Sequence, residues 1–223
     1  MHAMLPVLVF RVAALAWCAA AVLAAKQLLA HVVSRKTDCA LVAKNLVKAS
    51  VLAFMAPRAV AITWHGVAYG DWAAADIHTL ALMYGCTDMC GLLVVPRLRK
   101  STVAHHVFVT ALVVADAFTD YTRPTPMVAA VAAGAFASIT YPVNMVLAAS
   151  RTIGFLPQKH TVLLAATASV YTAAILLNAA VQVKLLTAFP LLHAAPLWIA
   201  AIFIMFDDVY LLAHMRKLLD VSK

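Results

Sequence analysis

The sequence contains few charged residues and no glutamate. Asp, Lys and Arg together make up 12% of the chain, all nine acidic residues are Asp, and 65% of the residues are hydrophobic. Water-soluble domains carry about twice this fraction of charged residues, so the composition excludes a soluble globular domain. Of the four cysteines only Cys39 lies in a predicted connection, which excludes a disulfide framework.

Apolar runs of about 20 residues, the length that crosses a bilayer as a helix, recur along the chain. We predict an all-α membrane bundle of about seven transmembrane helices, at Leu5–Ala25, Leu41–Ile62, Ala73–Val95, Ser101–Phe118, Met127–Ala148, Thr161–Ala180 and Ala194–Leu212. The connections are short, so residues 1–223 form a single transmembrane domain. Pro142 lies within the fifth segment and predicts a kink there.

The basic residues in the connections are distributed unequally between the two predicted sides. Eleven lie on one side, namely Lys26, Arg35, Lys36, Arg97, Arg99, Lys100, Arg151, Lys159, Arg216, Lys217 and Lys223. Three lie on the other, namely Arg58, Arg123 and Lys184. Because inner loops collect Lys and Arg, this asymmetry predicts an N-terminus outside and a C-terminus inside.

The net charge of +8 also bears on partners and location. The basic residues are scattered along one membrane face without interleaved aromatic residues, so we expect anionic lipid headgroups rather than nucleic acid as partners. The first 37 residues contain no acidic residue, which is compatible with import into an organelle. We expect an endoplasmic reticulum-like endomembrane or the mitochondrial inner membrane.

Polar residues in five of the segments fall at a similar predicted depth. Counted along the helices at 1.5 Å per residue, Asp88, His105 and His106 lie about 10–15 Å from the inner face. Lys48, Asn144 and Asp207 fall at comparable levels in their own segments. Ionisable residues at such a depth normally face the bundle or a wet cavity and indicate a functional site.

Helical spacing extends these positions into polar stripes. The further residues expected to line a cavity or contact lipid are Tyr84, Thr102, Thr110, Tyr210 and His214. The alternatives are that Lys44 and Lys48 extend to the headgroups, and that the histidines only join helices by hydrogen bonds. Asp116 and Asp120 lie toward the outer end of the fourth segment and are expected at the membrane interface.

Residues 76–151 resemble the TLC-domain family, which includes the ceramide synthases. The resemblance rests on Tyr84-Gly85-Cys86-Thr87-Asp88, on the basic turn from Pro96 to Thr102, and on the His105-His106 pair at the start of a segment. Ser138 to Asn144 loosely resembles a polar, proline-containing stretch of the non-synthase branch, and Phe206 to Leu219 resembles the family's last span. The resemblance implies that Asp88, His105 and His106 are functional positions.

The sequence departs from the synthases after the histidine pair. Ceramide synthases place an acidic group in the following span, where this chain has only small and apolar residues, Val131 to Ala137. We therefore expect a non-catalytic protein that binds or handles lipid, with no cofactor and with other membrane subunits as potential partners. Asp207 or Asp208 could supply the missing carboxylate.

Two other functions are compatible with the residues. In an acyltransferase that moves a fatty acyl group from acyl-CoA to an amine or hydroxyl, His105 or His106 would act as the general base. Asp88 or Asp207 would then stabilise the imidazolium. A channel, transporter or haem protein is a third reading, although the histidines do not form facing pairs on two segments.

Overall fold

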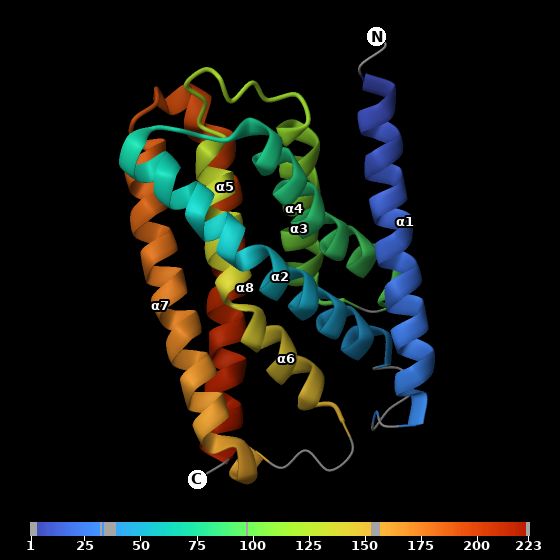
Figure 1. Ribbon diagram of the computed structural model, residues 1–223. Coiled ribbons are helices and arrows are strands. Elements are labelled where there is room, and N and C mark those ends of the chain that lie inside the picture. Colours follow the sequence, from blue (N-terminus) through green and yellow to red (C-terminus); the bar gives the residue numbers. More distant parts are fainter. Residues whose placement is uncertain (1–3, 32, 34–38, 97, 153–156, 222–223) are drawn as a thin grey trace.

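The computed structural model describes residues 4–31, 33, 39–96, 98–152 and 157–221 (Figure 1). The described regular elements are the helices α1 (Met4–Leu28), η1 (Leu29–His31), α2 (Cys39–Tyr69), α3 (Ala74–Val94), α4 (Lys100–Asp116), α5 (Val128–Ile139), α6 (Tyr141–Ala149), η3 (Pro157–His160), α7 (Thr161–Leu186) and α8 (Leu191–Val221). Every predicted apolar segment coincides with a helix or, for the fifth segment, with the α5–α6 pair. The prediction of an all-helical chain is therefore confirmed.

Five of these helices are long and apolar enough to cross a membrane, and the α5–α6 pair makes six if the two helices form one bent span. The predicted fourth segment corresponds to α4, which has 17 residues. Its length of about 25 Å is shorter than the hydrocarbon core of about 30 Å. The helices thus establish a membrane-embedded character.

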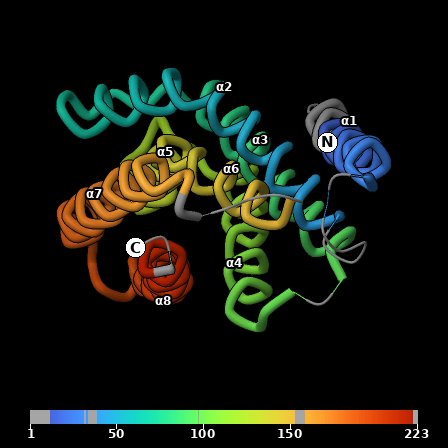
Figure 2. Tube along the Cα trace, turned by 90° about the horizontal axis from the view of Figure 1, so that it is seen from below, coloured from blue at the N-terminus to red at the C-terminus, as the bar shows by residue number. Residues whose placement is uncertain are grey.

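Seven of the described helices are arranged in a ring, and α1 packs outside it. Around the ring α2 packs on α3, α3 on α4, α4 on α8, α8 on α7, and α7 on α5, while α5 and α6 return to α2. Figure 2 shows this order along the bundle, with α1 beside α2 and α3. In Figure 1, α1 begins at the top of the bundle and α8 ends at the bottom.

The predicted kink lies between α5 and α6. Helix α5 ends at Ile139, α6 begins at Tyr141, and the two axes differ by 47°. Pro142 occupies the first turn of α6, where its missing N–H and fixed φ are tolerated. The prediction of a break at Pro142 is confirmed, and beyond the bend α6 packs on α2.

Glycine allows α3 and α4 to approach closely. A Cβ atom added at Gly85 would lie 2.4 Å from Cγ2 of Val113 on α4. Val113 is buried, and its branched side chain has few alternative rotamers. Hence α3 and α4 can hold their functional residues close together only while position 85 has no side chain.

Replacing Gly85 with Ala is expected to destabilise the protein by about 1–3 kcal/mol, because the new methyl overlaps Val113. The measurement is the thermal unfolding midpoint in detergent. Gly134→Ala is the matched control, since a Cβ there meets nothing within 4 Å. Val113→Ala combined with Gly85→Ala is expected to recover part of the loss. Equal midpoints for the two single variants would contradict the close approach.

Candidate functional site

A fully buried carboxylate, Asp88 on α3, lies at the centre of the polar residues. Lys48 Nζ on α2 is 2.5 Å from Asp88 Oδ1, and Lys44 Nζ is 3.8 Å from the same oxygen. His106 Nδ1 on α4 lies 3.1 Å from Asp88 Oδ1. Both lysine side chains are less than 10% exposed, so they pair with Asp88 rather than extending to the headgroups. Asp88 therefore joins α2, α3 and α4 through charge.

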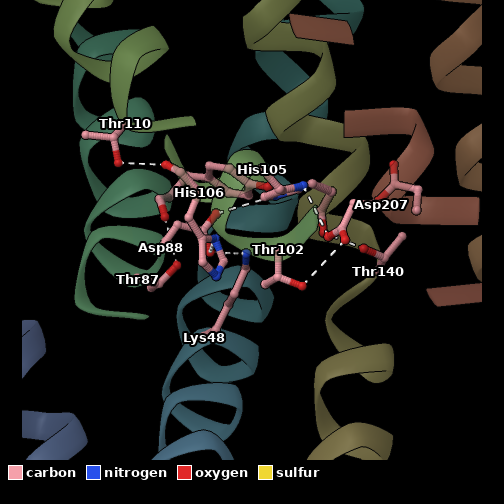
Figure 3. A network of polar contacts seen from close by, with 12 residues as sticks. Lys48, Thr87, Asp88, Thr102, His105, His106, Thr110, Thr140 and Asp207 are labelled. Atoms are coloured by element: carbon pink, nitrogen blue, oxygen red, sulfur yellow. Dashed lines mark hydrogen bonds and ion pairs between the residues drawn. The ribbon is translucent and has the colours of Figure 1, made fainter. Parts of the chain in front are cut away.

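His105 extends the cluster toward α8. Its Nε2 lies 3.8 Å from Asp88 Oδ2, and its Nδ1 lies 3.6 Å from Asp207 Oδ2. Thr102, one turn before His105, donates a hydrogen bond of 3.5 Å to Asp207 Oδ1. Figure 3 shows His105 between the Asp88 side of the cluster and Asp207. The convergence expected from the common depth is thus present on four helices of the ring.

These polar residues lie at one end of a cavity of about 740 Å³. The rest of the cavity is mostly apolar. This volume falls within the range of about 300–1,000 Å³ typical of ligand pockets. Lys48, His105, His106 and Asp207 line it, whereas Asp88 lies behind them and is not among its described lining residues. Asp88 therefore positions the cavity-lining cations and histidines without facing the cavity itself.

The remaining predicted residues divide into two groups. Tyr84, Thr102, Asn144, Tyr210 and His214 line the cavity as expected. Thr110 does not occur among the described lining residues, and its hydroxyl donates a 2.8 Å hydrogen bond to the carbonyl oxygen of His106. Hydroxyls within helices commonly make this bond four residues back, which removes Thr110 from the site.

The structure adds functional-site residues that the stripes did not predict. Tyr171 on α7 donates a 2.7 Å hydrogen bond to Asp208, and both residues line the cavity. Arg99 and Arg151 also line the cavity, and the Arg99 guanidinium is 3.9 Å from the ring centroid of Tyr210. Tyr171 was detectable as a polar ring in a helix otherwise rich in Val, Ala and Leu.

Several ring nitrogens in the site have no hydrogen-bond partner. Among the described buried side-chain atoms, Nε2 of His106 and Nδ1 of His105 make no hydrogen bond. Buried polar atoms normally have a partner, so such atoms call for an explanation. His105 Nδ1 faces Asp207 Oδ2 at 3.6 Å and His106 Nδ1 faces Asp88 Oδ1 at 3.1 Å, so both rings are held by the carboxylates around them.

The cluster also has the residue types of a metal site. Asp88, His105 and His106 can each offer one ligand atom, and these atoms all lie within 4.8 Å of one another. However, two lysine ammonium groups lie 2.5 and 3.8 Å from one oxygen of the same carboxylate. They would repel a dication at that position. We therefore interpret Asp88 as the counter-ion of Lys44 and Lys48.

Replacing Asp88 with Asn is expected to lower stability by about 3–5 kcal/mol, because it leaves two buried ammonium groups without a carboxylate. Thermal unfolding in detergent measures the loss. Asp76→Asn is the matched control, because Asp76 and its partner Arg58 have side chains that are 36% and 65% exposed. Exposed pairs contribute only about 0–1 kcal/mol. A small effect of both variants would show that the lysines do not depend on Asp88.

The chain matches no model of a known protein family, no curated protein and no solved structure. No comparison supports the resemblance to the TLC-domain family, which rests only on the residues quoted above within 76–151 and 206–219. Function has to be argued from the chemistry of the cavity and its lining.

Proposed function

We propose that this protein is a TLC-like membrane protein that binds or handles a lipid in the cavity within its ring of helices. The acyl chain would occupy the apolar part of the cavity, and the polar group of the lipid would contact Lys48, His105, His106 and Asp207. The observation that carries this proposal is the coexistence of both environments in one cavity of about 740 Å³.

The apolar part of the cavity supports the acyl-chain assignment. Residues of α2, α3, α4 and α5 form much of its wall, and they include Leu52, Met55, Ala59, Ile77, Leu80, Val109, Leu112, Val113, Val131 and Gly134. An acyl chain buried there contributes about 0.8 kcal/mol per methylene group. The chain needs no hydrogen bonds, which agrees with a wall made mostly of aliphatic side chains.

The polar end supports the headgroup assignment. Lys44 and Lys48 provide two cations around the single carboxylate of Asp88, and both lysines, His105 and His106 line the cavity. Such groups suit a carboxylate, hydroxyl or ester of a lipid. Arg99 and Arg151, which also line the cavity, suit the predicted inner side of the membrane.

The proposed topology places α4 as a seventh span, with the N-terminus outside and the C-terminus inside. Four of the basic residues in the charge count, Arg35, Lys36, Arg97 and Lys223, lie outside the described residues. The described positions Lys26, Arg99 and Arg216 follow or flank helix ends on the proposed inner side. Short α4 would be accommodated by local thinning of the bilayer.

A non-catalytic role is supported by the composition of α5. Its segment from Val131 to Ala137 is apolar or small, and several of its residues face the cavity where the synthases carry an acidic group. Large apolar side chains such as Trp17 on α1 and Phe206 on α8 are exposed on the outside of the bundle. These surfaces suit lipid or a neighbouring membrane subunit, and we propose an accessory role in a larger complex.

Filling the cavity tests lipid binding. Gly134→Phe is expected to abolish co-purification of lipid, because the ring would extend into the apolar part from a position where a Cβ meets nothing within 4 Å. Native mass spectrometry of protein extracted in mild detergent measures the bound lipid and the number of subunits together. Gly134→Ala, the matched control, is expected to retain lipid. If Gly134→Phe and Gly134→Ala both fold and neither carries lipid, the proposal is overturned.

One observation favours an acyltransferase as a second candidate. His105 lies between two carboxylates, 3.8 Å from Asp88 and 3.6 Å from Asp207, so a neighbouring acid can stabilise its imidazolium. His105 could remove the proton of an amine or hydroxyl that attacks an acyl thioester, and the thiolate would leave. Asp207 on α8 would then replace the acidic group that α5 lacks.

Replacing both His105 and His106 with Ala distinguishes these functions. An acyltransferase is expected to lose at least about 100-fold in turnover, the usual contribution of a general base. The assay follows transfer from a long-chain acyl-CoA to a long-chain amine or alcohol. His193→Ala, at an exposed position on α8, is the control. Undiminished turnover in the double variant would exclude the catalytic assignment, and lipid binding without turnover in wild type would favour the non-catalytic one.

A further inference from the structure

A second polar cluster lies at the opposite end of the cavity. Tyr121, in the connection after α4, donates a 2.9 Å hydrogen bond to Asp116 Oδ1, and His78 Nδ1 on α3 lies 3.0 Å from Asp116 Oδ2. Asp116 is 2% exposed and Tyr121 is 7% exposed, so Asp116, which was expected at the membrane interface, is buried among protein side chains at the end of α4. The hydrogen bonds of Asp116 with Tyr121 and His78 allow this carboxylate to be buried.

Asp116 and Tyr121 line the cavity, so they form its far wall. Burial raises the pKa of the Tyr121 phenol, and the neighbouring Asp116 carboxylate raises it further. The phenol therefore remains protonated and continues to donate to Asp116. The three side chains come from α3, α4 and the connection between α4 and α5, and they close the ring at its outer end.

The distance between the two polar ends follows from the helices that carry them. His105 and Asp116 are eleven residues apart on α4, and Lys48 and Ala59 are eleven residues apart on α2. Both separations correspond to about 16 Å. Half of the hydrocarbon core of a bilayer is about 15 Å, which is the depth that one membrane acyl chain fills. The apolar part of the cavity thus has the length of a common membrane acyl chain.

The far wall resists displacement more than the sides do. A chain longer than the cavity would have to push Tyr121 away from Asp116, which would leave a buried carboxylate without one of its donors. Such a loss is unfavourable because a desolvated acceptor has no water to replace the donor. The aliphatic side walls, by contrast, can repack against a chain without losing any hydrogen bond.

We propose that the His78–Asp116–Tyr121 cluster sets the greatest acyl-chain length that the cavity accepts. This inference rests on the proposed lipid-binding function and specifies the ligand of that site. It assigns to Tyr121 the role of a specificity-determining residue, since its ring forms the barrier and its hydroxyl holds the ring against Asp116.

The test measures competition between lauric, palmitic and arachidic acids for the purified protein in detergent by native mass spectrometry. Wild type is expected to bind palmitic acid and to discriminate against arachidic acid. Tyr121→Ala removes the barrier and is expected to raise the occupancy of arachidic acid relative to palmitic acid about tenfold, the effect of burying about two further methylene groups. Tyr121→Phe retains the ring and is expected to keep the wild-type preference.

Two further variants keep the result interpretable. Tyr69→Ala removes an exposed tyrosine at the outer end of α2 and is the matched control, with unchanged preference expected. Ala59→Leu adds bulk beside the far end of the cavity and is expected to shift the preference toward lauric acid, which tests the inference even where Tyr121→Ala does not fold. Bound fatty acids with the same length preference in Tyr121→Ala and Ala59→Leu as in wild type would overturn it. Absence of any bound fatty acid in wild type would overturn the lipid-binding function itself.

Discussion

The structure depends on one buried carboxylate that holds two ammonium groups inside an apolar bundle. Asp88 is completely buried, and Lys48 and Lys44 approach the same one of its oxygens. Two lysines without such a counter-ion would be costly here, since less than 10% of each side chain is exposed. The pairing fixes the rotation of α2 and α3 relative to each other. It thereby determines which side chains of both helices face the cavity.

The position of Asp88 behind the lining gives the two acidic residues different roles. Asp88 compensates charge and positions Lys48 and His106, whereas Asp207 lines the cavity and contacts His105 from α8. A change at Asp88 therefore acts first on stability, and a change at Asp207 acts first on what the cavity binds. The sequence named both as candidates, but only the packed structure separates them.

Sequence patterns predicted the helices well, and they placed at one level polar residues that meet in the structure, because both follow from distances along one helix. The apolar runs coincide with helices, and Pro142 marks the break between α5 and α6. Sequence patterns predicted less well how each helix is rotated about its own axis. Thr110 lies on the same stripe as His106 but donates to the backbone, and Asp88 faces its partners rather than the cavity. These outcomes depend on neighbouring helices, which no single-helix pattern contains.

The burial of Asp116 is another outcome that depends on neighbouring elements, and it bears on the proposed function. Its place near the end of α4 suggested an interfacial residue, because the sequence does not reveal that His78 and Tyr121 fold over it. With these partners, a carboxylate can close the outer end of an apolar cavity, while Lys48, His105 and His106 form the other polar end. Both ends consist of hydrogen-bonded or charged groups that cannot repack as aliphatic side chains can. The distance between them is therefore the least adjustable dimension of the cavity, and the one most suited to select a ligand by length.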